Sequence, residues 1–489
     1  MVCAVASLGG LLFGYDQGNM SEILQMPPFL EYFNYPNATH QGLMTSMLTL
    51  GCFLGALCSA YLADRLSRKY AIMVGCAVFI IGSALQTGAV NEAMMIVSRI
   101  IGGIGVGILS NIVPLFQSEL APPEIRGRLI CLQQIAITGG IMVAFWIGYG
   151  CSKIKTTASF RIPLGVQIIP ALVLMAAIMF MPFSPRWLIA KGRDEEACAV
   201  LAKLRAGGDL DHPMVIREFN EIKEVVTSEK EVESGSYLEL VKHPVRRRVI
   251  IGIVVQAFLQ LTGINTIMYY APKIFKQAGL KGTDAPLLAQ GINGVLNFLC
   301  TIPITVYIDK WGRRSTLMFG ALGMVVAYIA MGTIMAVYGK PFQDGSDTSI
   351  AYDNGAASRA TMAFVYIFVA CYALSWGPIC WIYPSEIFPM RVRAKATSIT
   401  TATNWIFNFL VAQVAPILMS DITWGLYIIF ACFNLLAFMH VFFFCPETKG
   451  VMLEDMDELF GQSVWAFKVK SQNVSHRADN DSSEKQTFE

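Results

Sequence analysis

Charged residues are scarce in this chain. Asp, Glu, Lys and Arg make up 15% of its 489 residues, whereas a soluble domain usually carries about 25%. Hydrophobic residues make up 54%, and the mean hydropathy is +0.51. The net charge of +2 gives no sign of a nucleic-acid partner. This composition excludes an ordinary soluble protein and favours a chain that lies in a lipid bilayer.

Several chemical signatures are also missing. The 12 cysteines and 5 histidines are dispersed without a Cys-x-x-Cys pair or a metal-ligand cluster, so we interpret the cysteines as small buried hydrophobic residues. No Gly-x-x-x-x-Gly-Lys-Ser/Thr loop occurs, which argues against an ATP-driven pump. Gly102–Gly107 lies inside an apolar run, so close helix packing explains it better than a nucleotide loop. Since no nucleophile lies beside a base, we predict neither an enzyme nor a cofactor.

Long apolar runs are abundant. About 20 apolar residues cross a bilayer as a helix, and these runs are too long for the strands of a barrel. The first run begins almost at residue 1, and no cleavable signal peptide precedes it. The sequence predicts twelve helical spans, near residues 1–20, 42–63, 70–89, 93–117, 126–150, 162–182, 248–278, 287–308, 315–338, 360–383, 396–419 and 422–445.

One long polar segment interrupts the spans and leaves six on either side. Its apolar residues recur at helical spacing, which predicts amphipathic helices at the cytoplasmic surface; a solvated linker is the alternative. These apolar residues are Ala197, Val200, Leu201, Leu204, Val215, Phe219, Ile222 and Val226. We expect a first six-helix bundle, a linker, a second six-helix bundle and a cytoplasmic tail, at residues 1–182, 183–246, 247–445 and 446–489.

Positive residues gather in some turns between the predicted spans. The turns after spans one, three and eleven hold none, whereas the turns after spans two, four, eight and ten hold several. By the positive-inside rule, both termini are predicted to be cytoplasmic, although five lysines fall on the outer side. The positive residues on the inner side are Arg65, Arg68, Lys69, Arg126, Arg128, Lys310, Arg313, Arg314, Arg391, Arg393 and Lys395.

The two sets of spans carry the same short sequences. Two halves related in parallel are typical of transporters that rock about a central site. The pairs of related segments are Ser118–Arg128 with Ser385–Lys395, Asp64–Lys69 with Asp309–Arg314, and, more loosely, Pro182–Arg186 with Pro446–Lys449.

Further motifs accompany these repeats along nearly the whole chain. They are Gly9–Asp16, Arg99–Gly103, Pro182–Leu188, Gln260–Asn265 with Tyr269 and Tyr270, and Pro446–Gly450. Jointly, the motifs resemble the sugar porter branch of the major facilitator superfamily. Three positions depart from the family pattern: Ser67 replaces a usual Gly, Phe183 replaces a usual Glu, and Leu259 replaces a Gln that many members carry.

The resemblance implies an all-α membrane protein with twelve transmembrane helices in two pseudo-symmetric six-helix bundles and a cytoplasmic helical linker. It implies secondary active transport of a monosaccharide, a hexose or a pentose, by alternating access and with a coupled proton. Open alternatives are a facilitative sugar or polyol uniporter and a non-transporting sugar sensor, which the short tail disfavours. We expect a monomer in the plasma membrane, with the sugar, the proton and the bilayer as its partners.

Amide side chains are frequent inside the predicted spans. Buried polar groups are costly in a bilayer unless they have a partner or a function, and amides suit sugar hydroxyls because each offers a donor and an acceptor. Bonding between helices is the alternative, and it is the one expected for Gln133, Gln256, Asn293, Asn408, Trp376 and Trp405. The resemblance selects as sugar contacts Gln134, Gln260, Asn265, Asn297, Trp381 and Asn404.

Two opposite charges lie in the first half. Asp16 falls inside the first predicted span and Arg99 opens the fourth. The resemblance implies proton coupling, because the family's symporters carry an Asp and an Arg at these positions. A conformational change that altered their separation would alter the proton affinity of the acid. A structural ion pair is the alternative, since some passive members of the family keep the acid.

Charged residues also gather at the predicted cytoplasmic ends of spans in both halves. The resemblance implies a charge network across the bundles that closes the inner gate, and anchoring of helix ends in anionic headgroups is the alternative. The predicted gate residues are Asp64, Arg68, Glu119, Arg126, Arg186, Asp309, Arg313, Glu386 and Arg393.

Overall fold

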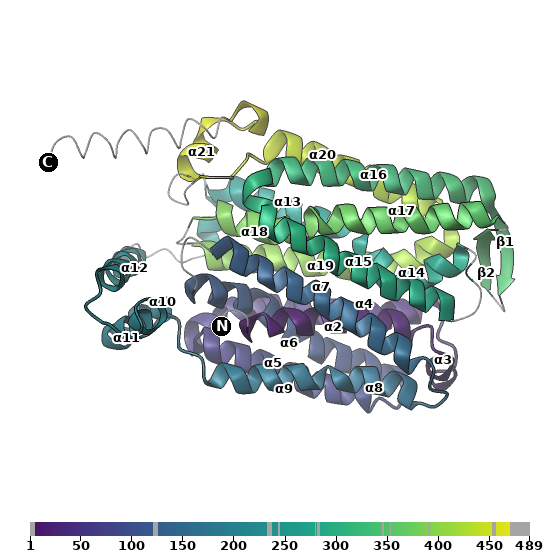
Figure 1. Ribbon diagram of the computed structural model, residues 1–489, viewed down its shortest axis with the longest axis horizontal. Coiled ribbons are helices and arrows are strands. Elements are labelled where there is room, and N and C mark those ends of the chain that lie inside the picture. The colour runs from purple at the N-terminus through teal and green to yellow at the C-terminus, as the bar shows by residue number, and fades with distance from the viewer. Residues whose placement is uncertain are drawn as a thin grey trace. The chain divides into compact units, whose positions relative to one another are not determined.

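The chain forms two compact units in a computed structural model (Figure 1). Unit 1 comprises Met1–Lys242 and Ala394–Phe409, and unit 2 comprises His243–Arg393 and Leu410–Glu489. The domain boundaries expected from the sequence stay predictions. The structure describes residues 5–120, 126–231, 237–242, 245–278, 280, 284–344, 347–352, 354–389, 392–451 and 456–469.

The described residues confirm an all-helical membrane fold. Eleven helical segments are long and apolar enough to cross a bilayer. They follow a helix of 16 residues, α2 (Leu8–Ile23), which corresponds to the first predicted span. The twelve spans expected from the sequence are therefore all present as helices.

Unit 1 contains the first six spans. A short helix, α3 (Pro27–Tyr32), follows α2 and begins with two prolines, which suit the first turn of a helix. The sixth span is divided into two helices, α8 and α9. The remaining helices of these spans are α4 (Ala38–Leu66), α5 (Arg68–Thr87), α6 (Glu92–Leu120), α7 (Arg126–Cys151), α8 (Ala158–Val166) and α9 (Ile168–Met179).

Glycines set the close packing of α6 against its two neighbours. Gly103 and Gly107 face α4, where an added Cβ would overlap the carbonyl oxygens of Leu48 and Cys52. Gly105 faces α5, where a Cβ would lie 2.7 Å from the carbonyl oxygen of Gly75. Close helix packing, the interpretation that the sequence favours for Gly102–Gly107, is thus confirmed, because the helix backbones approach too closely for larger residues.

The polar interruption folds as helices of unit 1. These are α10 (Pro185–Ala190), α11 (Asp194–Arg205), α12 (Pro213–Glu231) and a 3₁₀ turn, η2 (Tyr237–Val241). The predicted apolar faces pack together, with Ala197 of α11 against Val226 of α12 and Leu201 against Val215. Arg205 binds both carboxylate oxygens of Glu218 and donates to the carbonyl of Leu120 at the end of α6. The linker helices therefore lie at the end of unit 1 where α6 ends, which we call the linker end.

Unit 2 contains most of the spans in the second half of the chain. Its seventh and tenth spans are broken into the pairs α13/α14 and α17/α18, and α16 lies beside both α17 and α20 (Figure 1). The helices are α13 (Val245–Leu261), α14 (Ile264–Gln277), α15 (Asp284–Trp311), α16 (Arg313–Tyr338), α17 (Gly355–Ala373), α18 (Trp376–Ile387), α20 (Gly425–Phe444), α21 (Met456–Gln462) and the 3₁₀ turn η4 (Ala466–Lys468).

Two features of the second half were not predicted. A two-stranded antiparallel hairpin, β1 (Gly339–Asp344) with β2 (Asp347–Tyr352), occupies the polar turn between α16 and α17. The eleventh span, α19 (Arg393–Asp421), is shared between the units. In unit 1, Ser398 donates to the carbonyl of Ala56 at 2.8 Å and Trp405 Nε1 donates to Ser110 at 3.2 Å.

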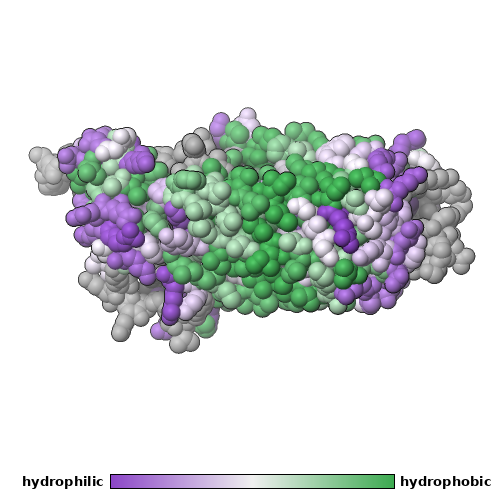
Figure 2. Space-filling model, turned by 90° about the horizontal axis from the view of Figure 1, so that it is seen from below, coloured by the Kyte–Doolittle hydropathy of each residue, from purple (hydrophilic) through white to green (hydrophobic). Residues whose placement is uncertain are grey.

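The exposed surface of the spans is apolar. Figure 2 shows hydrophobic side chains in the middle of the visible face and hydrophilic ones toward its two ends. On α5 and α9, large apolar side chains are exposed that water would solvate poorly, as expected for helices that face lipid. They are Val74, Ile81, Leu85, Ile169, Leu172 and Val173.

Candidate functional site

The predicted coupling pair meets inside unit 1. Asp16 on α2 and Arg99 on α6 are 0% and 1% exposed, and Arg99 Nη1 lies 3.5 Å from Asp16 Oδ1. This distance exceeds the 2.7–2.9 Å of a strong charge-assisted hydrogen bond. Asp16 Oδ2 and Arg99 Nε have no hydrogen-bond partner among the described residues. The pair is therefore buried and loosely joined, with an acceptor and a donor left over.

An Arg–Glu cluster lies at the linker end of unit 1. Arg68, at the start of α5, donates from Nε and Nη2 to Glu119 Oε1 of α6, both at 3.0 Å. Its Nη1 donates to the carbonyl of Ala63, five residues earlier, at 3.2 Å. One arginine thus joins the ends of α4, α5 and α6.

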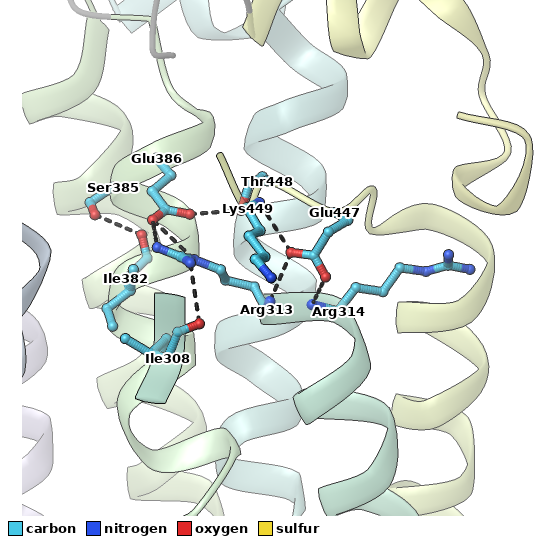
Figure 3. A network of polar contacts seen from close by, with 9 residues as sticks. All are labelled: Ile308, Arg313, Arg314, Ile382, Ser385, Glu386, Glu447, Thr448 and Lys449. Carbon is cyan, nitrogen blue, oxygen red and sulfur yellow. Dashed lines mark hydrogen bonds and ion pairs between the residues drawn. The ribbon is translucent and has the colours of Figure 1, made fainter. Parts of the chain in front are cut away.

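Unit 2 repeats this cluster. Arg313, at the start of α16, donates from Nη2 and Nε to Glu386 Oε1 of α18, at 2.8 and 3.2 Å (Figure 3). Its Nη1 donates to the carbonyl of Ile308, again five residues earlier, at 3.4 Å. The second oxygen of Glu386 accepts from Thr448 at 2.7 Å. The sequence repeat is therefore a repeat of hydrogen bonds as well.

The other predicted gate residues are placed less completely. Arg393 donates from Nε and Nη2 to the carbonyl of Phe388, and Arg186 lies in the first turn of α10. The side chains of Asp64, Arg126 and Asp309 lie outside the described residues. The two Arg–Glu pairs of the predicted gate each form within a unit, and a network across the bundles stays a prediction.

Two predicted sugar contacts of unit 2 lie together at a break in the seventh span. Gly263 adopts φ +83°, a left-handed conformation that glycine accommodates, and separates α13 from α14. Gln260 lies in the last turn of α13 and Asn265 in the first turn of α14, and Asn265 Nδ2 donates to Gln260 Oε1. Both side chains are buried. The break thus brings two amides into one polar group inside an apolar span.

Asn297, a third predicted sugar contact of unit 2, has an amide oxygen without a hydrogen-bond partner among the described residues. It lies on α15 and is 3% exposed. An unpaired acceptor at a buried position costs about 1–3 kcal/mol. Such an atom is well suited to accept a hydroxyl from a ligand. Trp381, another predicted sugar contact, is half-buried on α18.

The other two predicted sugar contacts belong to unit 1. Gln134 is half-buried on α7, and Asn404 is buried in the part of α19 that packs in unit 1. Several amides and tryptophans expected to serve packing have protein partners: Gln256 donates to Cys380, Asn293 to Gln290, Trp376 to Leu317 and Trp405 to Ser110.

Sequence reasoning missed one buried cation. Arg248 of α13 is 1% exposed and donates to the carbonyl of Ile387 at 3.3 Å and to that of Met456 at 3.1 Å. It therefore ties the end of α18, next to Glu386, to the start of α21. The sequence signal was a cluster of three arginines before an apolar run, which does not show that Arg248 is buried while Arg246 is exposed and Arg247 half-buried.

Broken spans, buried amides and an intramembrane ion pair define a membrane transporter, since all three are costly in lipid without a transport function. The profile of a family described as "Sugar (and other) transporter" matches residues 2–460. The chain is 41% identical over 481 residues to "MFS glucose transporter mfs1" of Aspergillus flavus, covering 96% of this chain and 90% of that protein. It is 38% identical over 471 residues to "High-affinity glucose transporter" of Kluyveromyces lactis, covering 95% and 85%.

A solved structure of the MFS proton:xylose symporter XylE bound to 6-bromo-6-deoxy-D-glucose matches with a TM-score of 0.80 at 28% identity, over 94% of this chain and 98% of that one. The chain belongs to the sugar transporter family of the major facilitator superfamily. It is an integral membrane protein and a sugar transporter, not an enzyme.

Proposed function

We propose that this transporter carries a monosaccharide together with a proton by alternating access. The observation that carries the proton coupling is the buried pair of Asp16 and Arg99, with its 3.5 Å separation and its two unpartnered atoms. The proton affinity of such an acid depends on the distance to the arginine. A transport step that changes this distance takes up or releases a proton.

The similarity to transporters of glucose and to a proton:xylose symporter supports a hexose or a pentose as the substrate. Amide groups suit such a ligand because they donate to and accept from hydroxyls. The unpartnered oxygen of Asn297 and the paired amides of Gln260 and Asn265 support this assignment in unit 2. We assign as sugar contacts Gln134, Gln260, Asn265, Asn297, Trp381 and Asn404.

The first prediction tests the coupling. Asp16→Asn keeps the size of the side chain but cannot gain and lose a proton, so the variant should lose accumulation of labelled sugar against a gradient while it retains sugar exchange. With a membrane potential of 100 mV, one proton per sugar drives roughly 50-fold accumulation, from about 2.3 kcal/mol per charge at 1.36 kcal/mol per decade.

The measurement compares uptake of labelled glucose and xylose, with and without an uncoupler, in cells that lack their own hexose transporters. Glu31→Gln, at an exposed acid of α3, is the matched control and should accumulate sugar like the wild type. Full accumulation by Asp16→Asn would refute the coupling. Wild-type uptake that the uncoupler leaves unchanged would instead indicate a uniporter.

A further inference from the structure

The break in the seventh span is crowded by two side chains from other helices. An added Cβ at Gly263 would overlap the hydroxyl of Tyr328 on α16 and the ring of Phe430 on α20. Combined with φ +83°, this crowding leaves room only for glycine. The break is therefore fixed by packing within unit 2.

The break also leaves backbone groups without helical partners. In an unbroken helix, the carbonyl of Thr262 would accept from the amide four residues later. Here, it accepts from Nδ2 of Asn434 on α20 at 3.2 Å. In lipid, an unsatisfied carbonyl is costly, and a neighbouring side chain commonly replaces the lost hydrogen bond.

Asn434 is an unusual residue for its place. It is 0% exposed in the middle of the strongly apolar helix α20, and its Nδ2 also donates to the carbonyl of Phe430, one turn earlier, at 2.8 Å. Polar groups at such positions are costly unless they have a function. Both described hydrogen bonds of Asn434 are donated to backbone carbonyls, one of them at the broken helix, and its Oδ1 has no hydrogen-bond partner among the described residues.

The carbonyl that Asn434 holds lies between two of the proposed sugar contacts. Thr262 is two residues after Gln260 and three before Asn265, and these amides bond to each other across the break. A rotation of the Thr262 peptide would therefore move one amide relative to the other. A displacement of about 1 Å is enough to weaken binding strongly.

We propose that Asn434 is a positioning residue for the sugar-binding amides: by holding the carbonyl of Thr262, it fixes the geometry between Gln260 and Asn265. This inference rests on the proposed function, in which both amides contact the sugar. Asn434 acts through the break and does not touch the substrate.

Tyr328 provides a matched control at the same break. Its ring packs on Phe430, with centroids 5.6 Å apart, but its hydroxyl has no hydrogen-bond partner among the described residues. Tyr328→Phe removes only this hydroxyl. Uptake by this variant should match the wild type, because no hydrogen bond is lost.

The experiment measures KM and the maximal rate of glucose uptake at equal surface expression. Asn434→Leu should raise KM roughly tenfold with a maximal rate within about twofold of the wild type, since binding geometry and not folding is changed. Asn434→Ser, which keeps the hydrogen bond to Phe430 but is too short for Thr262, serves if the leucine variant fails to reach the membrane.

A double-mutant cycle separates positioning from a general loss of structure. In a Gln260→Ala background, Asn434→Leu should raise KM by less than about twofold, because the amide it positions is already gone. A tenfold rise in both backgrounds, or no rise in either, would overturn the inference. If Gln260→Ala itself leaves KM unchanged, the proposed sugar contact is wrong. If Gln260→Ala raises KM but Asn434→Leu does not, only the positioning role of Asn434 is wrong.

Discussion

The two Arg–Glu clusters share their charged groups but differ in how the following helix is capped. Arg68 and Arg313 each bind a glutamate and the carbonyl five residues earlier. The residue before each arginine has nearly the same backbone, with φ 102° and ψ 157° at Ser67 and φ 83° and ψ 156° at Gly312. The side chain at that residue and the group that caps the following helix differ between the two clusters.

In unit 2, a carboxylate caps the helix. Glu447 accepts from the backbone N–H groups of Arg313 and Arg314, at 2.8 and 3.1 Å (Figure 3). A Cβ at Gly312 would lie 2.6 Å from Glu447 Oε2. The carboxylate therefore occupies the space that any other side chain at residue 312 would need.

In unit 1, the side chain before the arginine is itself the cap. Ser67 Oγ accepts from the backbone N–H of Tyr70 at 3.3 Å. Phe183, where the family usually has a glutamate, packs on Tyr70 with ring centroids 5.7 Å apart and lies beneath Lys69 Nζ at 5.0 Å. The contrast between the two caps predicts that a serine before the arginine together with a glutamate cap is the unfavourable combination, because the carboxylate needs the space of the Cβ.

The two clusters should differ most in how much stability is lost when the arginine is replaced. Glu119 Oε2 has no partner among the described residues, whereas Glu386 also binds Thr448. Arg68→Ala should therefore leave a buried carboxylate with no partner and destabilise the protein by about 3 kcal/mol. Arg313→Ala should cost less, about 1–2 kcal/mol.

Melting temperatures of the two purified variants in detergent test this order. Thr448→Val is the control, since it should bring the cost of Arg313→Ala up to that of Arg68→Ala. Equal melting temperatures for the two single arginine variants would contradict the expected difference between the clusters.

A smaller effect should follow from moving the unit 1 residue into unit 2. Gly312→Ser puts a Cβ against Glu447 and a serine at φ 83°, so it should destabilise the protein by about 2 kcal/mol. Adding Glu447→Phe should restore about 1 kcal/mol, because it removes the clash. A double variant that is less stable than the sum of both changes would contradict the pairing.

The smallest effect is expected from the reverse exchange in unit 1. Ser67→Gly relieves the backbone strain of a serine at φ 102°. It also removes the serine cap of α5, but replacing such a cap by glycine costs only a few tenths of a kcal/mol. The free energy of unfolding should therefore rise by up to about 1 kcal/mol. As a single substitution, Phe183→Glu should destabilise the protein. In the Ser67→Gly background, the same substitution should destabilise it less. Strict additivity in the melting temperatures would show that the two residues act independently.

The architecture was readable from the sequence because its signals are local. The apolar runs predicted twelve spans, and the helical spacing of the apolar residues from Ala197 to Val226 predicted the linker helices. The hairpin β1–β2 was missed, because a polar segment rich in Asp, Ser and Gly does not carry the apolar alternation of a strand.

The candidate site was only partly predictable. Asp16 and Arg99 were chosen together and lie together. The sequence placed Arg68 and Glu119 among the gate residues without indicating which of these residues pair, and the structure pairs these two from different helices. Sequence spacing identifies neighbours along one helix, but it does not identify partners between helices.

The sequence by itself determined that this protein is helical, spans a bilayer and carries a doubled set of motifs, because hydropathy and repetition are properties of consecutive residues. Tertiary structure alone decided that Asn434 supports a break 172 residues away, and that Glu447 caps α16 whereas Ser67 caps α5. Those outcomes depend on which side chains from distant parts of the chain come into contact. Packing between helices sets these contacts only once the chain has folded.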